Sequence, residues 1–235
     1  VVQAGPIVTG TYDAATLAST IIGSDSTIIG TPTLTYAGSD TLPAPAGTFT
    51  GGASTVGFAE GIVLTNGTVE CAGGPNASSA CGLERAGGGG GINDRTTLSF
   101  NFESTTGQVF FRYVFGSEEY TQYVGSDFND QFDLLLDDVN IALLPGGAGV
   151  VSINNVNCGA NSAYYRNNVN PANETEDNNT CPSLGLDLEY DGLTTILTAS
   201  GNVGSGTHNF AFTIYDRGDS ILDSGVYIEK GSFSG

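Results

Sequence analysis

The stretch that most constrains the fold of this chain is an apolar run that leads directly into a zone of carboxylates. Val109–Phe115 is almost continuously apolar or aromatic, which predicts a strand buried on both faces. From Glu118 to Asp138 the chain contains no Lys or Arg, and a second strand is predicted inside this zone at Gln131–Leu136. The acids of the zone are Glu118, Glu119, Asp127, Asp130, Asp133, Asp137 and Asp138. Because carboxylates beside a buried strand repel one another, they need positive charge, and a bound metal ion supplies it most simply.

The net charge of the chain argues against some classes of binding partner. The 235 residues include 25 acids and 6 bases, which gives a net charge of -19. This charge argues against nucleic acid as a partner and against binding to anionic membranes. It favours solubility and divalent cations. No apolar run is long enough to span a bilayer, so we expect a soluble protein without membrane insertion.

The four cysteines point to an oxidising compartment. An even number of cysteines in such a chain predicts two disulfides. We expect the pairs Cys71–Cys81 and Cys158–Cys181, because each pair brackets a polar, turn-rich segment. Zinc is the alternative, but neither pair has the close spacing of structural zinc ligands. We therefore expect a secreted protein, located outside the cell or on its surface after removal of a signal peptide.

Four short motifs match the pattern for N-glycosylation. In an organism that glycosylates proteins, the acceptors would be Asn66, Asn76, Asn173 and Asn178.

The remaining chain contains one helix signal and many strand signals. Asp13–Ile22 is predicted to be a short helix, with Asp13 as its N-cap and Gly23 closing its end. Further strands are predicted at Thr31–Tyr36, Ser54–Leu64, Thr96–Glu103, Ile141–Leu144, Val150–Val156, Leu193–Ala199, Asn209–Tyr215 and Val226–Lys230. Loops are predicted between them, including Gly38–Gly52, Cys71–Asn93 and Asn157–Cys181. This pattern predicts an all-β fold: an antiparallel, jelly-roll-like β-sandwich that forms one domain over residues 13–235.

Residues 1–12 are expected to form an extended N-terminal arm. Its apolar side chains are Val1, Val2, Ile7 and Val8. One alternative is that the arm pairs within its own domain as an edge strand. The other is that it adds to the sheet of a neighbouring copy, which would build a head-to-tail polymer.

Several segments resemble a known family. They are TLASTIIGSDSTI, GFAEGIVLTNG, FRYVFGSEEYTQYVGSDFNDQF, NIALLPG, VSINNVN, DGLTTILTAS and YDRGDSILDSGVYIEKGSF, in this order. Their sequence and order are similar to those of choice-of-anchor L domains, and the resemblance covers nearly the whole chain. It implies a β-rich domain on secreted prokaryotic proteins.

Two acidic loops, Ser117–Asp130 and Asp216–Asp223, follow strands and coincide with motif positions of that family. Calcium takes six to eight oxygen ligands, and a sandwich can bring two such loops together at one end. We expect the ligands to be Glu119, Asp130, Asp216 and Asp223, with Glu118, Asn129 and Asp219 as further candidates. The alternative is that these side chains cap turns by accepting hydrogen bonds from backbone N–H groups.

No residue pattern predicts an enzyme. Glu118 and Glu119 are adjacent, so on an extended segment they point to opposite faces and cannot flank one glycosidic bond. The sequence contains no nucleophile motif for which His208 could act as the catalytic base.

Tyrosines near the loops leave a carbohydrate-binding alternative open. Their rings could stack on surface glycans, and they are Tyr120, Tyr123, Tyr164 and Tyr165. The sequence predicts a calcium-stabilised structural or adhesive surface protein, which would be a self-assembling filament subunit if the N-terminal arm adds to the sheet of a neighbouring copy. A lectin-like module is the alternative.

Overall fold

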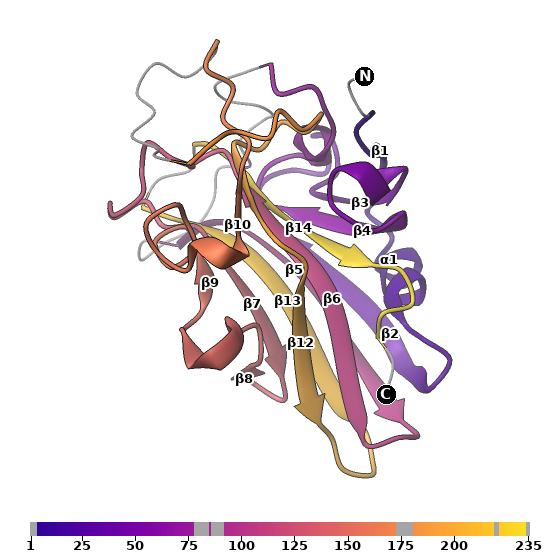
Figure 1. The fold of residues 1–235 in the computed structure, drawn as a ribbon. Helices are drawn as coiled ribbons and strands as arrows, with labels where there is room; N and C mark the ends of the chain where they lie inside the picture. Colours follow the sequence, from indigo (N-terminus) through magenta and orange to yellow (C-terminus); the bar gives the residue numbers. More distant parts are fainter. Residues whose placement is uncertain (1–3, 78–84, 86–91, 173–180, 219–220, 234–235) are drawn as a thin grey trace.

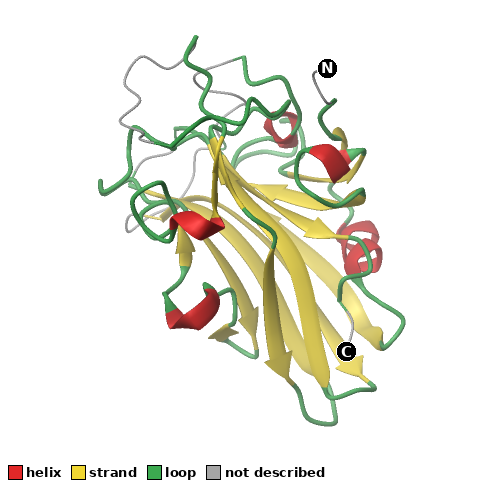
Figure 2. Ribbon diagram, in the orientation of Figure 1, coloured by secondary structure: helices red, strands yellow, loops and turns green. Residues whose placement is uncertain are grey.

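The computed structural model describes residues 4–77, 85, 92–172, 181–218 and 221–233. Two antiparallel sheets pack face to face as a sandwich, with 44% strand and 10% helix (Figures 1 and 2). The predicted all-β sandwich is therefore confirmed. None of the helices in the described part of the chain has the length and hydropathy needed to cross a bilayer.

The larger sheet has eight strands, and β6 is central to it because it pairs with three of the others. The sheet runs in the order β1 (Ile7–Gly10), β3 (Ala46–Thr50), β4 (Glu60–Thr65), β14 (Ser224–Glu229), β6 (Gln108–Ser117), β11 (Gly192–Thr194) and β10 (Tyr165–Asn167). The first part of β6 pairs with β12 (Leu197–Asn202). The residues after Phe115 pair with β11 instead.

The smaller sheet has six strands, and β13 lies in its interior. The order is β2 (Ser26–Tyr36), β5 (Ile92–Ser104), β13 (His208–Arg217), β7 (Gln131–Leu136) and β8 (Val139–Asn140), with β9 (Val151–Ser152) also paired to β7. The strand predicted at residues 131–136 has the observed bounds of β7.

Aromatic side chains from both sheets fill the space between them. Phe102 and Phe210 from the smaller sheet and Phe111 from the larger sheet are fully buried. Phe111 contacts Phe210 with ring centroids 4.8 Å apart. Phe233, near the end of the chain, joins the cluster and lies 4.6 Å from Phe102. Such pairs add about 0.5–1.5 kcal/mol each to the free energy gained by burial.

The predicted helix is present as α1 (Ala14–Ile21). The carboxylate of Asp13 caps it by accepting a hydrogen bond from Ala15 N at 3.0 Å. Gly23 does not close the helix by a left-handed turn. Its N–H donates to the carbonyl of Phe233 at 2.6 Å, and a Cβ on Gly23 would lie 2.6 Å from the same oxygen. Glycine is needed here because two backbone segments approach closely.

Two strands lie where loops are predicted. β3 falls within the predicted loop Gly38–Gly52, and β10 falls within the predicted loop Asn157–Cys181. β3 is paired on both sides, to β1 and to β4. Backbone pairing to two neighbours outweighs the low strand propensity of its short, glycine-containing sequence.

Other predicted strands are shorter than expected or wrong. Ser54–Leu64 is a strand only from Glu60, because Gly52–Ser54 forms a 3-10 turn. Ile141–Leu144 is not a strand. The side-chain oxygen of Asn140 accepts from Ala142 N at 3.0 Å and turns the chain away from β7.

The strand β6 is buried on both faces only in its second half. Phe110 is half-buried and Arg112 is exposed, whereas Tyr113–Ser117 is buried throughout. There the outer face is covered by a second apolar cluster that includes Tyr190 and Leu193.

The N-terminal segment pairs within its own chain. From Ile7–Thr50 to Gly10–Gly47, β1 is antiparallel to β3 and forms one edge of the larger sheet. This arrangement is the first of the two alternatives considered for the arm. Val1 and Val2 lie outside the described residues.

One predicted disulfide is confirmed. Cys158 and Cys181 are bonded, with Cα atoms 5.8 Å apart. Cys71 is buried, but Cys81 lies outside the described residues, so the Cys71–Cys81 bond stays a prediction.

Candidate metal centre

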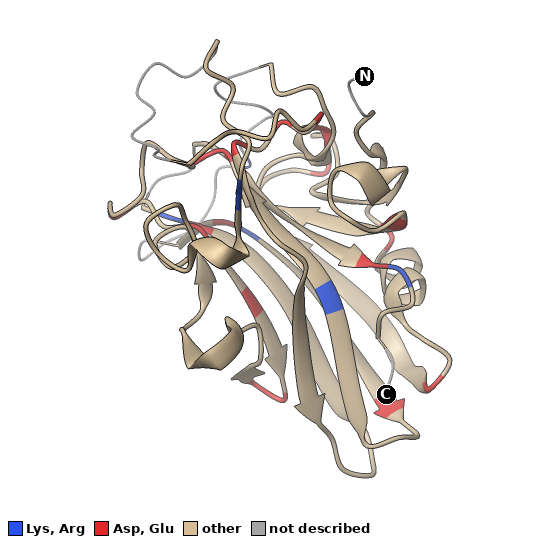
Figure 3. Ribbon diagram, viewed as in Figure 1, with Lys and Arg blue, Asp and Glu red and all other residues tan. Residues whose placement is uncertain are grey.

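Three carboxylates from three separate segments meet at the loop end of the sandwich. Glu119 lies in the turn after β6, Asp130 immediately precedes β7, and Asp216 lies near the end of β13. Each contributes one oxygen, and the three oxygens lie within 4.8 Å of one another. All three residues are at most 1% exposed. Acidic segments are visible in the loops at the upper end of Figure 3.

Strand register brings Asp130 and Asp216 together. Tyr215 is opposite Gln131 in the β13–β7 ladder. Asp216 follows Tyr215 and Asp130 precedes Gln131, so the two acids are neighbours. On the other side of β13, the register with β5 shifts between Ile214 and Asp216. Such bulges redirect side chains. Here the bulge lies next to the carboxylate cluster.

Asp130 accepts hydrogen bonds at both of its carboxylate oxygens. Its Oδ2 accepts from Ser224 Oγ at 2.5 Å and from Asn66 Nδ2 at 3.4 Å, and its Oδ1 accepts from Arg217 N at 3.3 Å. Burial raises the pKa of Asp130 to about 6, and these hydrogen bonds act in the opposite direction. The dominance of burial shows that a negative charge is costly at this position.

Glu118 and Asp223 are joined to each other by two hydrogen bonds and are not part of the group of three carboxylates. Asp223 N donates to Glu118 Oε2 at 3.2 Å, and Glu118 N donates to the carbonyl of Asp223 at 3.1 Å. The carboxylate of Asp223 lies directly against Gly67, where any side chain would overlap with it. Glycine at position 67 therefore allows the loop that contains Asp223 to approach.

The predicted ligands thus do not all meet at one point. Glu119, Asp130 and Asp216 are together, whereas Glu118 and Asp223 are bonded to each other and are not part of that group. Asn129 has its side-chain oxygen directed to Asn154 N at 2.9 Å. Asp219 lies outside the described residues.

Asn66 and Ser224 belong to the site and are not among the predicted ligands. Ser224 N donates to Asn66 Oδ1 at 2.6 Å, and both side chains donate to Asp130. The sequence signal at Asn66-Gly67 is a turn, and nothing in it indicates a contact with residue 130.

Two of the four predicted glycosylation acceptors, Asn66 and Asn76, use their side-chain nitrogens in hydrogen bonds within the fold. The side-chain nitrogen of Asn66 is buried and bonded to Asp130. That of Asn76 donates to Asn168 O at 3.0 Å and to Asp191 Oδ1 at 2.8 Å. In the folded state the nitrogen of Asn66 does not face solvent as an acceptor must, whereas Asn76 is half-buried and stays a predicted acceptor. Asn173 and Asn178 lie outside the described residues.

The donor set of the cluster suits a hard cation. Carboxylate oxygens are the ligands that calcium and magnesium prefer, and the three grouped residues include no His or Cys that would favour zinc. Glu119 and Asp130 come from the two ends of one loop, so a cation bound by both would close that loop.

Two of the four tyrosines considered for sugar stacking are in the core. Tyr120 and Tyr165 are at most 8% exposed, and their rings contact each other with centroids 4.8 Å apart. Tyr123 packs edge-on against Phe128 at 5.4 Å. Tyr164 is half-buried. The buried pair cannot serve as a stacking platform for a glycan.

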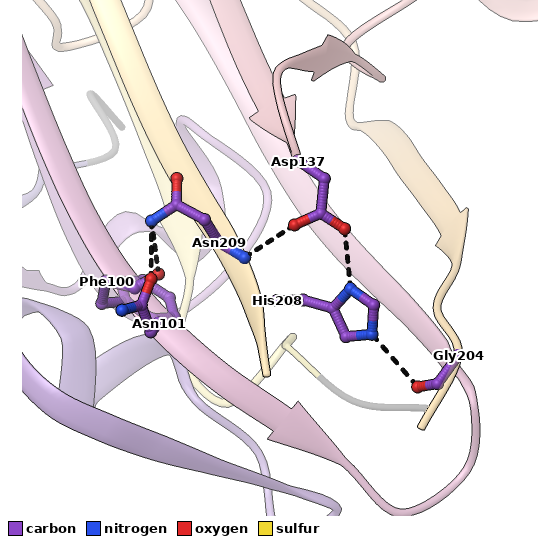
Figure 4. Close-up of polar contacts among 6 residues, drawn as sticks. All are labelled: Phe100, Asn101, Asp137, Gly204, His208 and Asn209. Carbon is purple, nitrogen blue, oxygen red and sulfur yellow. Dashed lines mark hydrogen bonds and ion pairs between the residues drawn. The ribbon is translucent and has the colours of Figure 1, made fainter. Parts of the chain in front are cut away.

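His208 has a structural environment. Its Nδ1 lies 2.7 Å from Asp137 Oδ2, and its Nε2 lies 3.1 Å from the carbonyl of Gly204 (Figure 4). Because a carboxylate and a carbonyl both accept, both ring nitrogens donate when the ring is protonated. The hydrogen bond from His208 helps to lower the pKa of Asp137, after that from Asn209 N, and the bond to Asp137 raises the pKa of His208. The pair holds the β12–β13 loop against the turn after β7.

Comparison with known proteins identifies one relationship. The family model of the Choice-of-anchor L domain matches residues 7–234, which is almost the whole chain. No curated protein and no solved structure matches the chain.

Proposed function

Because this chain belongs to the Choice-of-anchor L domain family, whose members are related to the cell surface, we propose that it is a calcium-stabilised structural or adhesive domain of a secreted or surface protein. The family is not known for enzymatic activity. The proposal therefore rests on what the carboxylate cluster does for the stability of the sandwich.

The observation that supports calcium is the proximity of three buried carboxylate oxygens, all within 4.8 Å of one another. Taking an ion out of water costs several kcal/mol even after the protein relaxes. A divalent cation between the oxygens offsets this cost by direct attraction. Seven or so oxygen ligands are usual for calcium. The three carboxylates would supply the charge, and water or backbone carbonyls would complete the shell.

A cation at this position would connect the two sheets. Glu119 follows a strand of the larger sheet, whereas Asp130 and Asp216 belong to the smaller sheet. Binding would hold the loop end of the sandwich closed. A domain exposed outside the cell, where calcium is plentiful, would gain stability from the medium itself.

The test is a thermal melt of chelator-treated protein with added CaCl₂. Ligand binding to the folded state alone stabilises it by about 2.7 kcal/mol at one hundred times the dissociation constant. We expect the calcium-dependent rise in Tm to be lost in Asp130→Asn. It should be retained in Asp127→Asn, which changes an exposed acid in the same loop.

The increment on adding calcium is the readout, because Asp130→Asn also changes the stability of the metal-free protein. Magnesium serves as the comparison ion and should give a smaller increment. If protein shown to be metal-free by elemental analysis has the same Tm at every calcium concentration, the proposal is wrong.

The carbohydrate-binding alternative has no comparable support, since Tyr120 and Tyr165 pack in the core. A glycan array with the intact domain would still detect such binding.

A further inference from the structure

One edge of the larger sheet is open to another strand. β1 is the terminal strand of that sheet, and only its inner edge pairs, with β3. Among the described residues, no strand pairs with its outer edge. Backbone N–H and C=O groups on an open edge are a template for a further strand.

The register fixes which residues present those groups. Thr11 N donates to Ala46 O at 2.8 Å, and Thr11 is opposite Ala46 when the β1–β3 register is continued. Hydrogen-bonded and non-hydrogen-bonded pairs alternate along an antiparallel ladder. Ile7 and Thr9 therefore bond inward to β3. Val8 and Gly10 present their N–H and C=O groups at the open edge.

A groove runs along this edge. Its volume is about 550 Å³, and it is lined by Val8, Gly10, Tyr12, Leu42, Pro43, Ala44, Val69 and Glu70. The two outward-facing residues of β1 are both in its wall. Most of the lining is apolar, and Val69 and Ala44 pack directly over Gly10, where a Cβ would lie 3.1 Å from Val69 Cγ1.

We propose that two copies of this chain associate through β1, antiparallel, about a two-fold axis that passes at Thr9. In this register Val8 of each copy is opposite Gly10 of the other, and the two pairs form four backbone hydrogen bonds. The side chain of each Val8 then lies beside the other copy's Gly10, against the apolar groove wall that Val69 and Ala44 form there. The strand is self-complementary because its two outward residues, Val8 and Gly10, pair with each other across the axis.

The ends and the charge of β1 agree with this pairing. Pro6 has no N–H to donate, so the ladder ends there. Ile7–Gly10 carries no charged side chain, so no like charges face each other across the axis. The contact is isologous, which makes a closed dimer and not an open filament.

β2, which is an edge strand of the smaller sheet, is less suited to pairing with a second copy. The β2–β5 register shifts between Ile29 and Thr33, Gly30 has a φ of 75°, and Pro32 lies inside the strand. A bulge and a proline are the usual protection of an edge against addition of another strand.

Charge makes the dimer dependent on salt. Each copy has a net charge of -19, so the two repel at low ionic strength. The screening length falls to about 8 Å at physiological salt. We expect sedimentation velocity to show a dimer fraction that rises with NaCl concentration.

Disulfide trapping of the intact domain tests the register. In the proposed pairing the two Thr9 residues form a non-hydrogen-bonded pair, with Cα atoms about 4.5 Å apart, inside the range for a disulfide. Ile7 of one copy is opposite Thr11 of the other. The two Ile7 residues are therefore four residues apart, roughly 13 Å at about 3.4 Å per residue.

Oxidised Thr9→Cys should run as a covalent dimer, at twice the 24.0 kDa chain mass, on a non-reducing gel. Ile7→Cys should stay monomeric, although Ile7 is 72% exposed. Equal cross-linking of both variants would indicate random collision and overturn the proposal, as would the absence of cross-linking in both.

Val8→Pro provides a second measurement without an added thiol. It removes an outward N–H and leaves the inward bonds of Ile7 and Thr9 to β3 in place. We expect the dissociation constant of the dimer to increase at least tenfold, with an unchanged circular dichroism spectrum. A folded Val8→Pro variant that dimerises as the parent does would contradict the pairing.

Discussion

Ser224 Oγ donates a 2.5 Å hydrogen bond to Asp130 Oδ2, so the first residue of β14 in the larger sheet is bonded to the residue that precedes β7 in the smaller sheet. Both residues are fully buried. A hydrogen bond to a buried carboxylate is of the stronger, charge-assisted kind.

We predict that Ser224→Ala lowers the free energy of unfolding by about 1.5–3 kcal/mol, because a hydrogen bond to a charged group is lost inside the protein. Denaturant unfolding at neutral pH measures this. Ser200→Ala removes an exposed hydroxyl from β12 and is the control. Equal, small effects of the two changes would show that the Ser224–Asp130 bond does not stabilise the fold.

The His208–Asp137 pair predicts a decline in stability above neutral pH. The pKa of His208 is raised from 6.5, so its contribution is complete below 6.5 and is lost as pH rises through the folded-state pKa. The pKa of Asp137 is lowered from 3.8, so its contribution is complete above 3.8 and is lost as pH falls through the lower folded-state value. Both contributions are present between these limits.

Tm measured from about pH 6 to about pH 8 should therefore fall more in the parent protein than in Asp137→Asn, where the histidine has lost its charged partner. Asparagine also tolerates the positive φ of 47° at this position. Because the side chain of Asp137 is 50% exposed, solvent screens the pair and the difference should be modest. Parallel pH profiles of the two proteins would contradict the prediction.

The turn between β7 and β8 contains avoidable strain. Asp137 and Asp138 both have positive φ, 47° and 66°, as the two central residues of a tight hairpin turn require. Asp138→Gly should stabilise the protein by about 0.5–1 kcal/mol, since glycine adopts this conformation without steric cost. The measurement is the midpoint of denaturant unfolding. Asp127→Gly, at an exposed position outside the set of positive-φ residues, should not stabilise.

The Cys158–Cys181 bond closes a segment of 23 residues. In the chain-entropy model its removal costs about 3 kcal/mol, because the unfolded chain regains freedom. The double variant Cys158→Ser/Cys181→Ser should therefore unfold at a lower denaturant concentration than the parent. Peptide mapping of the unreduced parent protein identifies the partner of Cys71, and a Cys71–Cys158 peptide would contradict both assignments.

The parts of the fold that the sequence predicts well are those with a strong local signal. β7 contains the apolar residues Phe132 and Leu134–Leu136 between turn residues, and α1 has a capping aspartate at its start. β3 and β10 were not predicted, because their short sequences carry no local signal and form strands only through pairing with neighbours.

The candidate site also contains some residues that the sequence predicts and others that it does not. Glu119, Asp130 and Asp216 stand out in the sequence because they belong to two acidic loops that follow predicted strands. Asn66 and Ser224 do not, since their contact with Asp130 depends on the packing of one sheet against the other. Burial also separates Tyr120 from the loop surface that the sequence suggests for it.

The position of β14 has a consequence for the order of folding. This strand is the last of the described strands, yet it lies between β4 and β6 in the interior of the larger sheet and supplies Ser224 to the carboxylate cluster. Until residues 224–229 are in place, β1, β3 and β4 are not joined to β6 and its other partners. The larger sheet, and with it the hydrogen bond from Ser224 to Asp130, is therefore completed only when this strand has joined β4 to β6.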